Sequence, residues 1–375
     1  MHYLAILGRQ PEFGLVELES LLGSDSVHPF GKSTAIIDRE LDLNRLGGTQ
    51  KLGRILYRGP TRDLNEAPIS LDELPIREGK TSFGLSYYGA SITQRYVMAA
   101  GLTLKKRLRS KGSMRFVAPQ TGTHLTAAQV KFNGLTRGGF ELIVATRKNE
   151  MIIARTEQIQ DIDWYAVRDY QRPTRSASVG MLPPKLAQIL VNTTSAPLVY
   201  DPFTGTGVIL QEALLLNRAA RGSDLSEAMV TAAKENLTWL NGQRPDLPTW
   251  SIELVDARQL RLPDEPLAIV SEGYLGPNMG KRPTLAEVNR LRRELGDLYA
   301  ESLTNWAKQL PSGAEVSITA PMWLTAKGWH KLDIIDRLSD LGYNLESFRH
   351  VDSRSLDYHR PNQIVGRQLL ILRKQ

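Results

Sequence analysis

The chain has 375 residues, a formal net charge of +7 and a sequence pI of about 9.4. Hydrophobic residues make up 41% and charged residues 23%, as in ordinary globular proteins, and no apolar run approaches the roughly 20 residues of a membrane span. Cysteine is absent, which excludes disulfides and thiolate metal sites, and the histidines show no metal-ligand spacing, so we expect no bound metal.

The N-terminal stretch MHYLAILGRQPEFG has no basic start and no small-residue cleavage site. A secretory signal would carry both features. We therefore expect a cytoplasmic protein that does not associate with a membrane. Its positive net charge favours a polyanionic partner.

Residues 1–75 predict a small α+β domain. Its acidic residues Glu17 and Glu19 are interpreted as the solvated face of a helix, and nothing in this region indicates chemistry. Apolar residues at helical spacing separate two short apolar runs. The expected strand, helix and strand are Tyr3–Leu7, Phe13–Leu22 and Ala35–Ile37.

Residues 76–157 predict a second α+β domain that ends in a β-hairpin. The expected strands are Thr81–Tyr87, Met114–Val117, Phe140–Val144 and Met151–Thr156, and the expected helices are Ser91–Gly112 and Thr126–Phe132.

The longer of these helices ends in a basic run. Leu104 and Leu108 can face a core while the cations face water. One interpretation is a solvated helix end that the helix dipole stabilises. The other is a surface that contacts nucleic-acid phosphates. The cations are Lys105, Lys106, Arg107, Arg109 and Lys111.

Residues 158–184 are polar and broken by prolines, and we interpret them as a linker. Residues 185–375 alternate strands with helices, which predicts a parallel, doubly wound sheet. The expected strands are Leu198–Tyr200, Arg221–Asp224, Trp250–Val255, Leu267–Ser271, Ala314–Thr319 and Val365–Leu372. The expected helices are Lys185–Asn192, Val208–Asn217, Ser226–Leu240, Leu285–Leu310 and His330–Leu341.

A glycine turn follows the first of these strands. The strand ends at Asp201, and Gly205 and Gly207 leave room for a ligand against the backbone before the next helix begins. Leu210 stands where a dinucleotide fingerprint has its third glycine, and no phosphate-loop motif is present. The turn therefore indicates a nucleotide-type ligand site that matches neither an NAD fingerprint nor a phosphate loop.

Acidic residues end the next two strands. Asp224 can accept hydrogen bonds from ribose hydroxyls, and Asp256 can accept a hydrogen bond from the adenine amine. S-adenosylmethionine fits such a pocket because it carries ribose and adenine but no phosphate. The alternative is that these residues are only turn formers. The expected cofactor-binding residues are Asp201, Phe203, Thr204, Gly205, Gly207, Asp224, Leu225, Asp256, Ala257 and Ser271.

Three motifs together resemble the THUMP-domain RNA methyltransferases, above all the tRNA guanosine-10 N2-methyltransferases of archaea and eukaryotes. They are Asp201-Pro202-Phe203-Thr204-Gly205-Thr206-Gly207, Arg172-Pro173 and Leu182-Pro183-Pro184-Lys185-Leu186-Ala187. The resemblance implies an α/β fold: a Rossmann-like class I methyltransferase sheet over 185–375, preceded by a ferredoxin-like domain over 1–75 and a THUMP-like RNA-binding domain over 76–157.

The family carries D-P-P-Y at the end of the fourth strand, where this chain has Ser271-Glu272-Gly273-Tyr274. Matching the tyrosines puts Ser271 in the acidic position. Matching the carboxylates puts Glu272 there, and we prefer this alignment because an exocyclic amine needs a strong acceptor. By the resemblance, Glu272 and the Gly273 carbonyl would accept from the target amine, and Tyr274 would stack on a flipped base.

The resemblance implies a methyltransferase that uses S-adenosylmethionine to methylate guanosine N2 in tRNA. Methylation of another nucleic acid amine, in rRNA or DNA, and a non-catalytic tRNA-binding protein of the same fold are the alternatives. The family's eukaryotic members work with a small activating subunit, so the chain acts either with such a subunit or as a monomer. Further phosphate contacts, or ordinary basic loop residues, are Lys281, Arg282 and Arg360.

Overall fold

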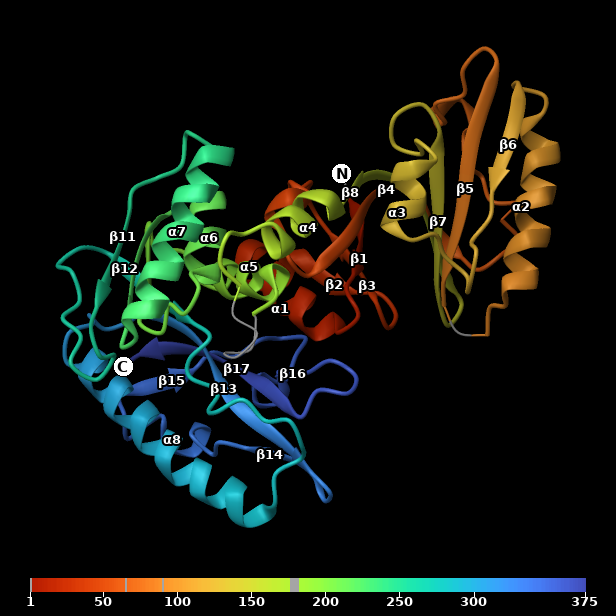
Figure 1. Ribbon diagram of the computed structural model, residues 1–375. Helices are drawn as coiled ribbons and strands as arrows, with labels where there is room; N and C mark the ends of the chain where they lie inside the picture. The colour runs from red at the N-terminus through yellow and green to blue at the C-terminus, as the bar shows by residue number, and fades with distance from the viewer. Residues whose placement is uncertain (1, 65, 90, 176–181) are drawn as a thin grey trace. The chain divides into compact units, whose positions relative to one another are not determined.

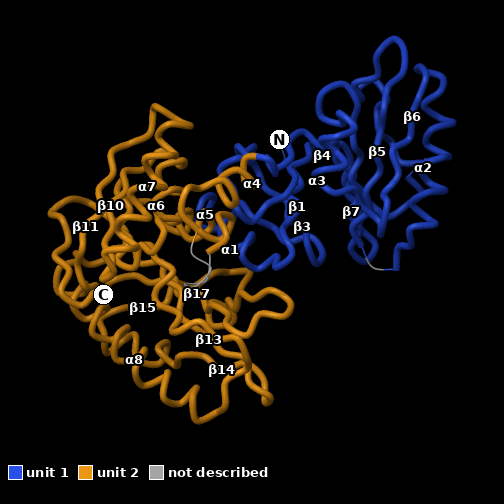
Figure 2. Tube along the Cα trace, in the orientation of Figure 1, with its two compact units in different colours: residues 1–163 blue, residues 164–375 orange. Residues whose placement is uncertain are grey.

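The computed structural model describes residues 2–64, 66–89, 91–175 and 182–375. The chain divides into two compact units, residues 1–163 and 164–375 (Figure 2). Each unit is built around its own β-sheet. Within the described ranges, no helix combines the length and the apolar character that crossing a bilayer requires.

Unit 1 contains an eight-stranded sheet in the order β2-β3-β1-β4-β8-β7-β5-β6 (Figure 1). The strands are β1 (Tyr3–Leu7), β2 (Val27–Pro29), β3 (Thr34–Ile37), β4 (Thr49–Pro60), β5 (Lys80–Tyr88), β6 (Ser113–Val117), β7 (Phe140–Arg147) and β8 (Glu150–Ile159). The helices are α1 (Pro11–Leu22), α2 (Gln94–Leu108) and α3 (Ala127–Phe132), with 3₁₀ turns at Ser24–Ser26, Leu43–Arg45 and Leu71–Glu73.

One sheet spans both of the domains expected in the N-terminal half. β4, from the first, pairs antiparallel with β8, from the second, between Lys51↔Ile159 and Pro60↔Glu150. β4 was absent from the sequence prediction, which treated Gly47-Gly48 and Pro60, just before and at the end of this strand, as breaks in regular structure. Close packing explains the glycine at position 53, since a Cβ there would lie 3.1 Å from the Cβ of Ala154 on β8. The division at residue 75 remains a prediction.

The expectation that Glu17 and Glu19 lie on a solvated helix face is wrong. Both are buried, and Glu17 is fully enclosed. Its two carboxylate oxygens accept the N–H groups of Gly47 and Gly48, each over 2.8 Å. Close packing brings this turn to the helix, because a Cβ on Gly48 would lie 2.5 Å from the Cα of Gly14.

Unit 2 contains a sheet in the order β11-β10-β9-β12-β13-β17-β15, with β14 paired to β13 and β16 to β17. The strands are β9 (Leu198–Asp201), β10 (Ala219–Asp224), β11 (Trp250–Leu254), β12 (Leu267–Ser271), β13 (Glu315–Thr325), β14 (Gly328–Lys331), β15 (Tyr343–Leu345), β16 (Asp357–Tyr358) and β17 (Val365–Lys374). The helices are α4 (Ile162–Tyr170), α5 (Pro184–Asn192), α6 (Val208–Leu215), α7 (Glu227–Gln243) and α8 (Leu285–Ala307), with 3₁₀ turns at Ile335–Arg337 and Ser353–Ser355.

The predicted doubly wound architecture is confirmed for this unit. β9 to β13 pair in parallel, and β17 is antiparallel to β13. Figure 1 shows α6 and α7 on one face of the sheet and α8 on the other. The face under α8 holds a large apolar core that includes Tyr299, Trp306 and Trp323. Strand reversal from β9 to β12 makes a topological switch point, where α/β sheets bind ligands.

One expected helix does not form. A helix over His330–Leu341 is wrong, because the segment forms β14 and then a 3₁₀ turn. Asp333 has a left-handed φ of 61°, which a continuous helix does not allow. The apolar spacing that suggested a helix instead buries Leu332 and Leu338 in the core. In the expected linker, by contrast, α4 forms; the part of that linker over 176–181 lies outside the described residues.

Candidate functional site

The glycine turn folds back against the neighbouring strand. Thr204 donates its N–H to the carbonyl of Ser223 (3.0 Å) and its hydroxyl hydrogen to the carbonyl of Asp201 (2.8 Å). This places the Thr204 hydroxyl on Gly222, where a Cβ would lie 2.1 Å away. Glycine at position 222 is thus needed for the turn to close.

The two glycines of the turn have different surroundings. Gly205, with φ 51°, donates its N–H to Oδ2 of Asp224 over 2.9 Å. Gly207, with φ 84°, packs on α7, because a Cβ there would lie 3.3 Å from the Cβ of Ala233. Positive φ favours glycine at both positions. Gly207 therefore serves the packing of the turn.

A buried carboxyl group lies under the turn. Asp201 is 1% exposed, and its Oδ1 accepts the N–H of Phe203 (3.1 Å) and the hydroxyl hydrogen of Ser271 (2.6 Å). Burial raises the pKa of Asp201 to about 7, against the lowering effect of these two hydrogen bonds. Asp201 acts here as an acceptor that joins the ends of β9 and β12.

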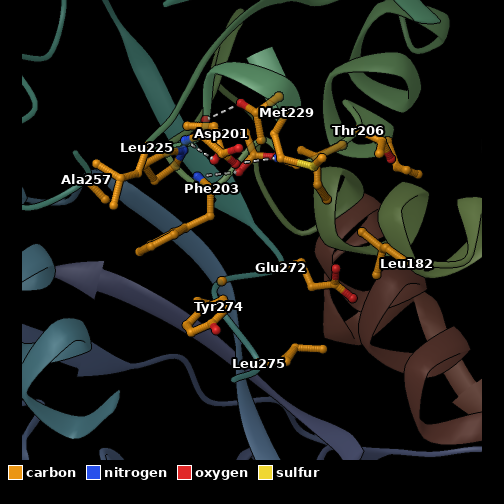
Figure 3. A pocket seen from close by; sticks show the side chains of 18 of the residues that line it. Leu182, Asp201, Phe203, Thr206, Leu225, Met229, Ala257, Glu272, Tyr274 and Leu275 are labelled. Atoms are coloured by element: carbon orange, nitrogen blue, oxygen red, sulfur yellow. Dashed lines mark hydrogen bonds between the residues drawn. The ribbon is translucent and has the colours of Figure 1, made fainter. Parts of the chain in front are cut away.

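A cavity of about 670 Å³ opens where β9, β10, β11 and β12 end. This volume is within the range of small-molecule sites. The expected site residues that line it are Asp201, Phe203, Thr204, Gly205, Asp224, Leu225, Asp256, Ala257, Glu272, Gly273 and Tyr274. Figure 3 shows Asp201, Phe203, Leu225 and Met229 gathered at one end of the cavity and Glu272, Tyr274 and Leu275 at the other.

Two expected cofactor-binding residues, Gly207 and Ser271, are not among the lining residues. Ser271 is fully buried and donates to Asp201, so its hydroxyl is engaged inside the sheet. Both support the turn and strand tips that do line the cavity, and their direct contact with a cofactor remains a prediction.

The carboxylates at the ends of β10 and β11 have partners in the protein. Asp224 accepts the N–H groups of Gly205 and Ser226, each over 2.9 Å, which leaves further lone pairs on both oxygens. Asp256 is bound by the Arg258 side chain, with Nη2 and Oδ2 at 2.6 Å. This cation holds the pKa of Asp256 below its usual range. Arg258 itself lines the cavity, which the sequence did not indicate.

Past β12 the chain departs sharply from extended backbone. Gly273 has φ 70°, and a Cβ there would lie 2.1 Å from Oη of Tyr299 on α8. Tyr299 in turn donates to the carbonyl of Thr319 (2.8 Å), and the Thr319 hydroxyl donates to the Glu272 carbonyl. The loop is therefore anchored on α8 and β13. Tyr274 remains 42% exposed at the cavity.

Glu272 lines the cavity and is paired with an arginine that sequence reasoning missed. Nε of Arg367, on β17, donates to Oε1 of Glu272 over 2.5 Å. The Arg367 side chain is 4% exposed and the Glu272 side chain 16%. Burial raises the pKa of Glu272, and Arg367 opposes that rise. The sequence signal for this pair was Arg367-Gln368, two polar residues inside the expected apolar strand Val365–Leu372.

The rest of the cavity wall comes from residues to which the sequence assigned no binding role, although Leu182, Pro202 and Thr206 lie in the motifs. They are Leu182, Pro202, Thr206, Val208, Ile209, Ser226, Met229, Arg258, Leu275 and Leu298. Most are apolar, and such residues look like ordinary core positions in a sequence. Among the described residues, no group of three His, Asp or Glu side chains could hold a metal ion.

The basic candidates lie apart from this cavity's lining. Those of unit 1 end α2, where Leu104 and Leu108 are buried as expected, and Lys111 pairs with Asp72 over 2.8 Å. In unit 2, Lys281 and Arg282 precede α8 and Arg360 precedes β17; all three are exposed. Their contact with RNA phosphates remains a prediction.

No protein-family model matches the chain. Two curated relatives are similar to parts of it, and both are named tRNA (guanine(10)-N2)-dimethyltransferase. That of Methanothermobacter thermautotrophicus is 31% identical over 148 residues, 39% of this chain and 40% of the relative. That of Pyrococcus abyssi is 46% identical over 59 residues, 16% of this chain and 18% of the relative. The chain thus matches less than half the length of these relatives.

Solved structures share the fold over the whole chain. TrmN from Thermus thermophilus has a TM-score of 0.55 at 18% identity and is covered completely, as is this chain. SMU.472, assigned as a methyltransferase and complexed with SAH, has a TM-score of 0.52 at 11% identity, with 100% of this chain and 97% of that chain covered. The expected α/β fold with a Rossmann-like sheet is confirmed, and the names of the two relatives agree with the resemblance to tRNA guanosine-10 N2-methyltransferases over the matched residues.

Proposed function

We propose that this protein is a tRNA methyltransferase that transfers a methyl group from S-adenosylmethionine to the exocyclic N2 of a guanosine, at position 10. The observation that carries the proposal is one cavity that joins the carboxylates Asp224 and Asp256 to Glu272 and Tyr274. The names of the curated relatives support this substrate.

The end of the cavity that holds Asp224, Leu225 and Met229 suits an adenosine group without phosphates. Asp224 would accept the ribose hydroxyls, because both of its oxygens keep lone pairs beyond the bonds from Gly205 and Ser226. Leu225, which is 71% exposed although apolar, and the neighbouring Met229 and Ala257 would pack on the adenine. Among the described residues, the cation that lines the cavity is Arg258, and its guanidinium is already paired with Asp256 over 2.6 Å, so no unpaired cation there is available for a phosphate. S-adenosylmethionine, when bound, supplies an electrophilic methyl group.

The other end suits a planar base with an exocyclic amine. Glu272 would accept a hydrogen of that amine, and the exposed ring of Tyr274 would stack on the base. Catalysis then combines positioning of the amine with polarisation of its N–H bond by the Glu272 carboxylate, because the lone pair of guanine N2 is delocalised into the ring. Glu272 rather than Ser271 takes the acceptor role, since Ser271 is buried and donates to Asp201.

Partner and location follow from this substrate. The N-terminal half would bind tRNA, with the basic end of α2 as the phosphate-contacting surface. A cytoplasmic location fits a tRNA-modifying enzyme. Whether the chain works as a monomer or with a small activating subunit is decided by assaying the purified chain alone.

The test is nucleotide mapping after incubation of the purified full chain with an unmodified tRNA transcript and labelled S-adenosylmethionine. We expect label on N2 of guanosine 10, and parallel incubations with rRNA and DNA give none. Label confined to rRNA or DNA contradicts the substrate. Binding of tRNA without binding of S-adenosylmethionine in calorimetry instead identifies a non-catalytic RNA-binding protein.

A pair of variants tests the assignment of the cofactor end. Asp224→Ala should weaken S-adenosylmethionine binding by about 10-fold or more, because hydrogen bonds to a charged group contribute about 1.5–3 kcal/mol. Glu227→Ala is the matched control, since Glu227 is an exposed carboxylate near the start of α7 outside the cavity. Equal affinity of the two variants would remove Asp224 from the cofactor site.

A further inference from the structure

Glu272 is held from three directions. Its carbonyl accepts the Thr319 hydroxyl from β13, its Oε1 accepts Nε of Arg367 from β17, and the next residue is confined by Tyr299 of α8. Glutamate has one more rotatable bond than the aspartate of the D-P-P-Y motif, so an unrestrained side chain would lose more entropy on reaching a target. The anchors remove much of that freedom in advance.

The ion pair leaves one oxygen for a ligand. Arg367 uses Oε1, and no residue that the structure describes donates a hydrogen bond to Oε2. The guanidinium does not line the cavity whereas the carboxylate does. The guanidinium of Arg367 therefore lies on the side of the Glu272 carboxylate that faces away from the cavity, and the carboxylate itself borders the cavity.

We propose that Arg367 is a positioning residue for the target amine: it holds the Glu272 carboxylate oriented and charged, with Oε2 directed to the substrate. The inference rests on the proposed function, because an amine substrate gives Glu272 its role. A carboxylate is a strong acceptor only when ionised, and burial favours the neutral acid. Arg367 counters that effect by its charge and its hydrogen bond.

The charged and titratable groups around Glu272 come from four elements. Arg367 of β17 is the cation in contact; Asp201 at the end of β9 and Tyr299 of α8 lie close enough to interact electrostatically, and Tyr274 follows in the same loop. Removing Arg367 leaves Asp201 and burial to oppose ionisation. The pKa of Glu272 should then rise, and the acidic limb of the pH–rate profile should move to higher pH.

The first experiment needs no turnover. Carbon-13 NMR titration of the glutamate carboxyls in the full chain, with Glu272→Gln to identify the signal, should show Glu272 titrating at higher pH in Arg367→Met than in wild type. Arg367→Lys keeps the cation and should remain near wild type. An unchanged titration in Arg367→Met overturns the proposal, whatever the enzyme's substrate is.

The second experiment measures transfer to tRNA. Arg367→Met should lower kcat by about 10²-fold, the usual cost of one preorganised electrostatic group, with unchanged affinity for S-adenosylmethionine. Raising the pH should restore part of this loss in Arg367→Met but none in Glu272→Gln. The double variant should be no slower than Glu272→Gln, because both changes remove one function. Additive losses, or no recovery at high pH, would assign Arg367 a merely structural role.

A matched control lies on the same strand. Arg373 pairs with Glu315 and Glu346 at the other end of β17, outside the cavity. Arg373→Met removes a comparable arginine and should leave kcat and the pH profile unchanged. If wild type transfers no methyl group, the proposed function fails while the NMR titration still tests the Arg367–Glu272 pair.

Discussion

Ser271, the last residue of β12, donates its hydroxyl hydrogen to the Asp201 carboxylate at the end of the adjacent strand β9, over 2.6 Å. The same Oδ1 accepts the N–H of Phe203 at 3.1 Å. An asparagine at position 201 could accept both hydrogen bonds through its single carbonyl oxygen. The glycine turn therefore needs an acceptor at this oxygen but not a negative charge.

Asp201→Asn should change how stability depends on pH. The folded pKa is about 7 and the unfolded value about 4, so the folded state binds the proton more tightly. The resulting stability is complete at low pH and is lost as pH rises to 7. Relative to wild type, the variant should gain about 3 kcal/mol between pH 5 and pH 8. Urea unfolding at both pH values measures this, and a constant difference between the proteins would refute it.

Glu17 should contribute strongly to the stability of unit 1. Glu17→Ala leaves the N–H groups of Gly47 and Gly48 without their carboxylate acceptors, at about 1–3 kcal/mol each. Glu17→Gln keeps one acceptor and should cost less. Glu12→Ala, on the exposed side of the same helix, is the control and should change the unfolding midpoint little. Equal midpoints for the Glu12 and Glu17 variants would contradict the buried role.

The buried pair of Lys51 and Glu141 should be costly to break. Nζ lies 2.5 Å from Oε1, the two side chains are 1% and 0% exposed, and Ser86 and Thr156 also donate to the carboxylate. Lys51→Met leaves the buried Glu141 carboxylate without its cation and should destabilise the chain by about 3–5 kcal/mol. Adding Glu141→Gln removes that charge and should recover part of the loss in thermal unfolding.

The control for that pair is a surface ion pair on the same sheet. Arg58 and Glu150 lie 2.6 Å apart but are 54% and 41% exposed. Arg58→Met should cost less than about 1 kcal/mol, because solvent screens the interaction. A loss as large as that of Lys51→Met would mean that burial does not set the difference.

The basic end of α2 should contact tRNA phosphates. Replacing Lys106 and Arg109 by Gln should weaken tRNA binding and reduce the slope of log K against log salt by about one for each lost contact. Lys111→Gln should have a smaller effect, since Asp72 already pairs with it. Lys32→Gln is the control, an exposed lysine elsewhere in unit 1. An unchanged salt slope in the double variant would favour the other interpretation, in which these cations only form a solvated helix end.

Local sequence patterns by themselves determined most elements and the chemical class of the site. The strand, glycine turn and helix from Leu198 to Leu215 form as predicted, because hydrophobic periodicity and glycine placement act over a few residues. The acidic strand ends Asp224 and Asp256 meet in one cavity, because parallel strands bring their carboxyl ends to one edge of the sheet.

Only the tertiary structure decided which polar groups pair. Arg367 is 95 positions from Glu272, and Gly47 is 30 from Glu17, so no local pattern joins them. It also placed Ser271 and Glu272 differently: the Ser271 hydroxyl donates to Asp201 within the sheet, whereas Glu272 lines the cavity. The physical reason is that a buried polar group must be satisfied by whatever packing brings near, and packing depends on the whole chain.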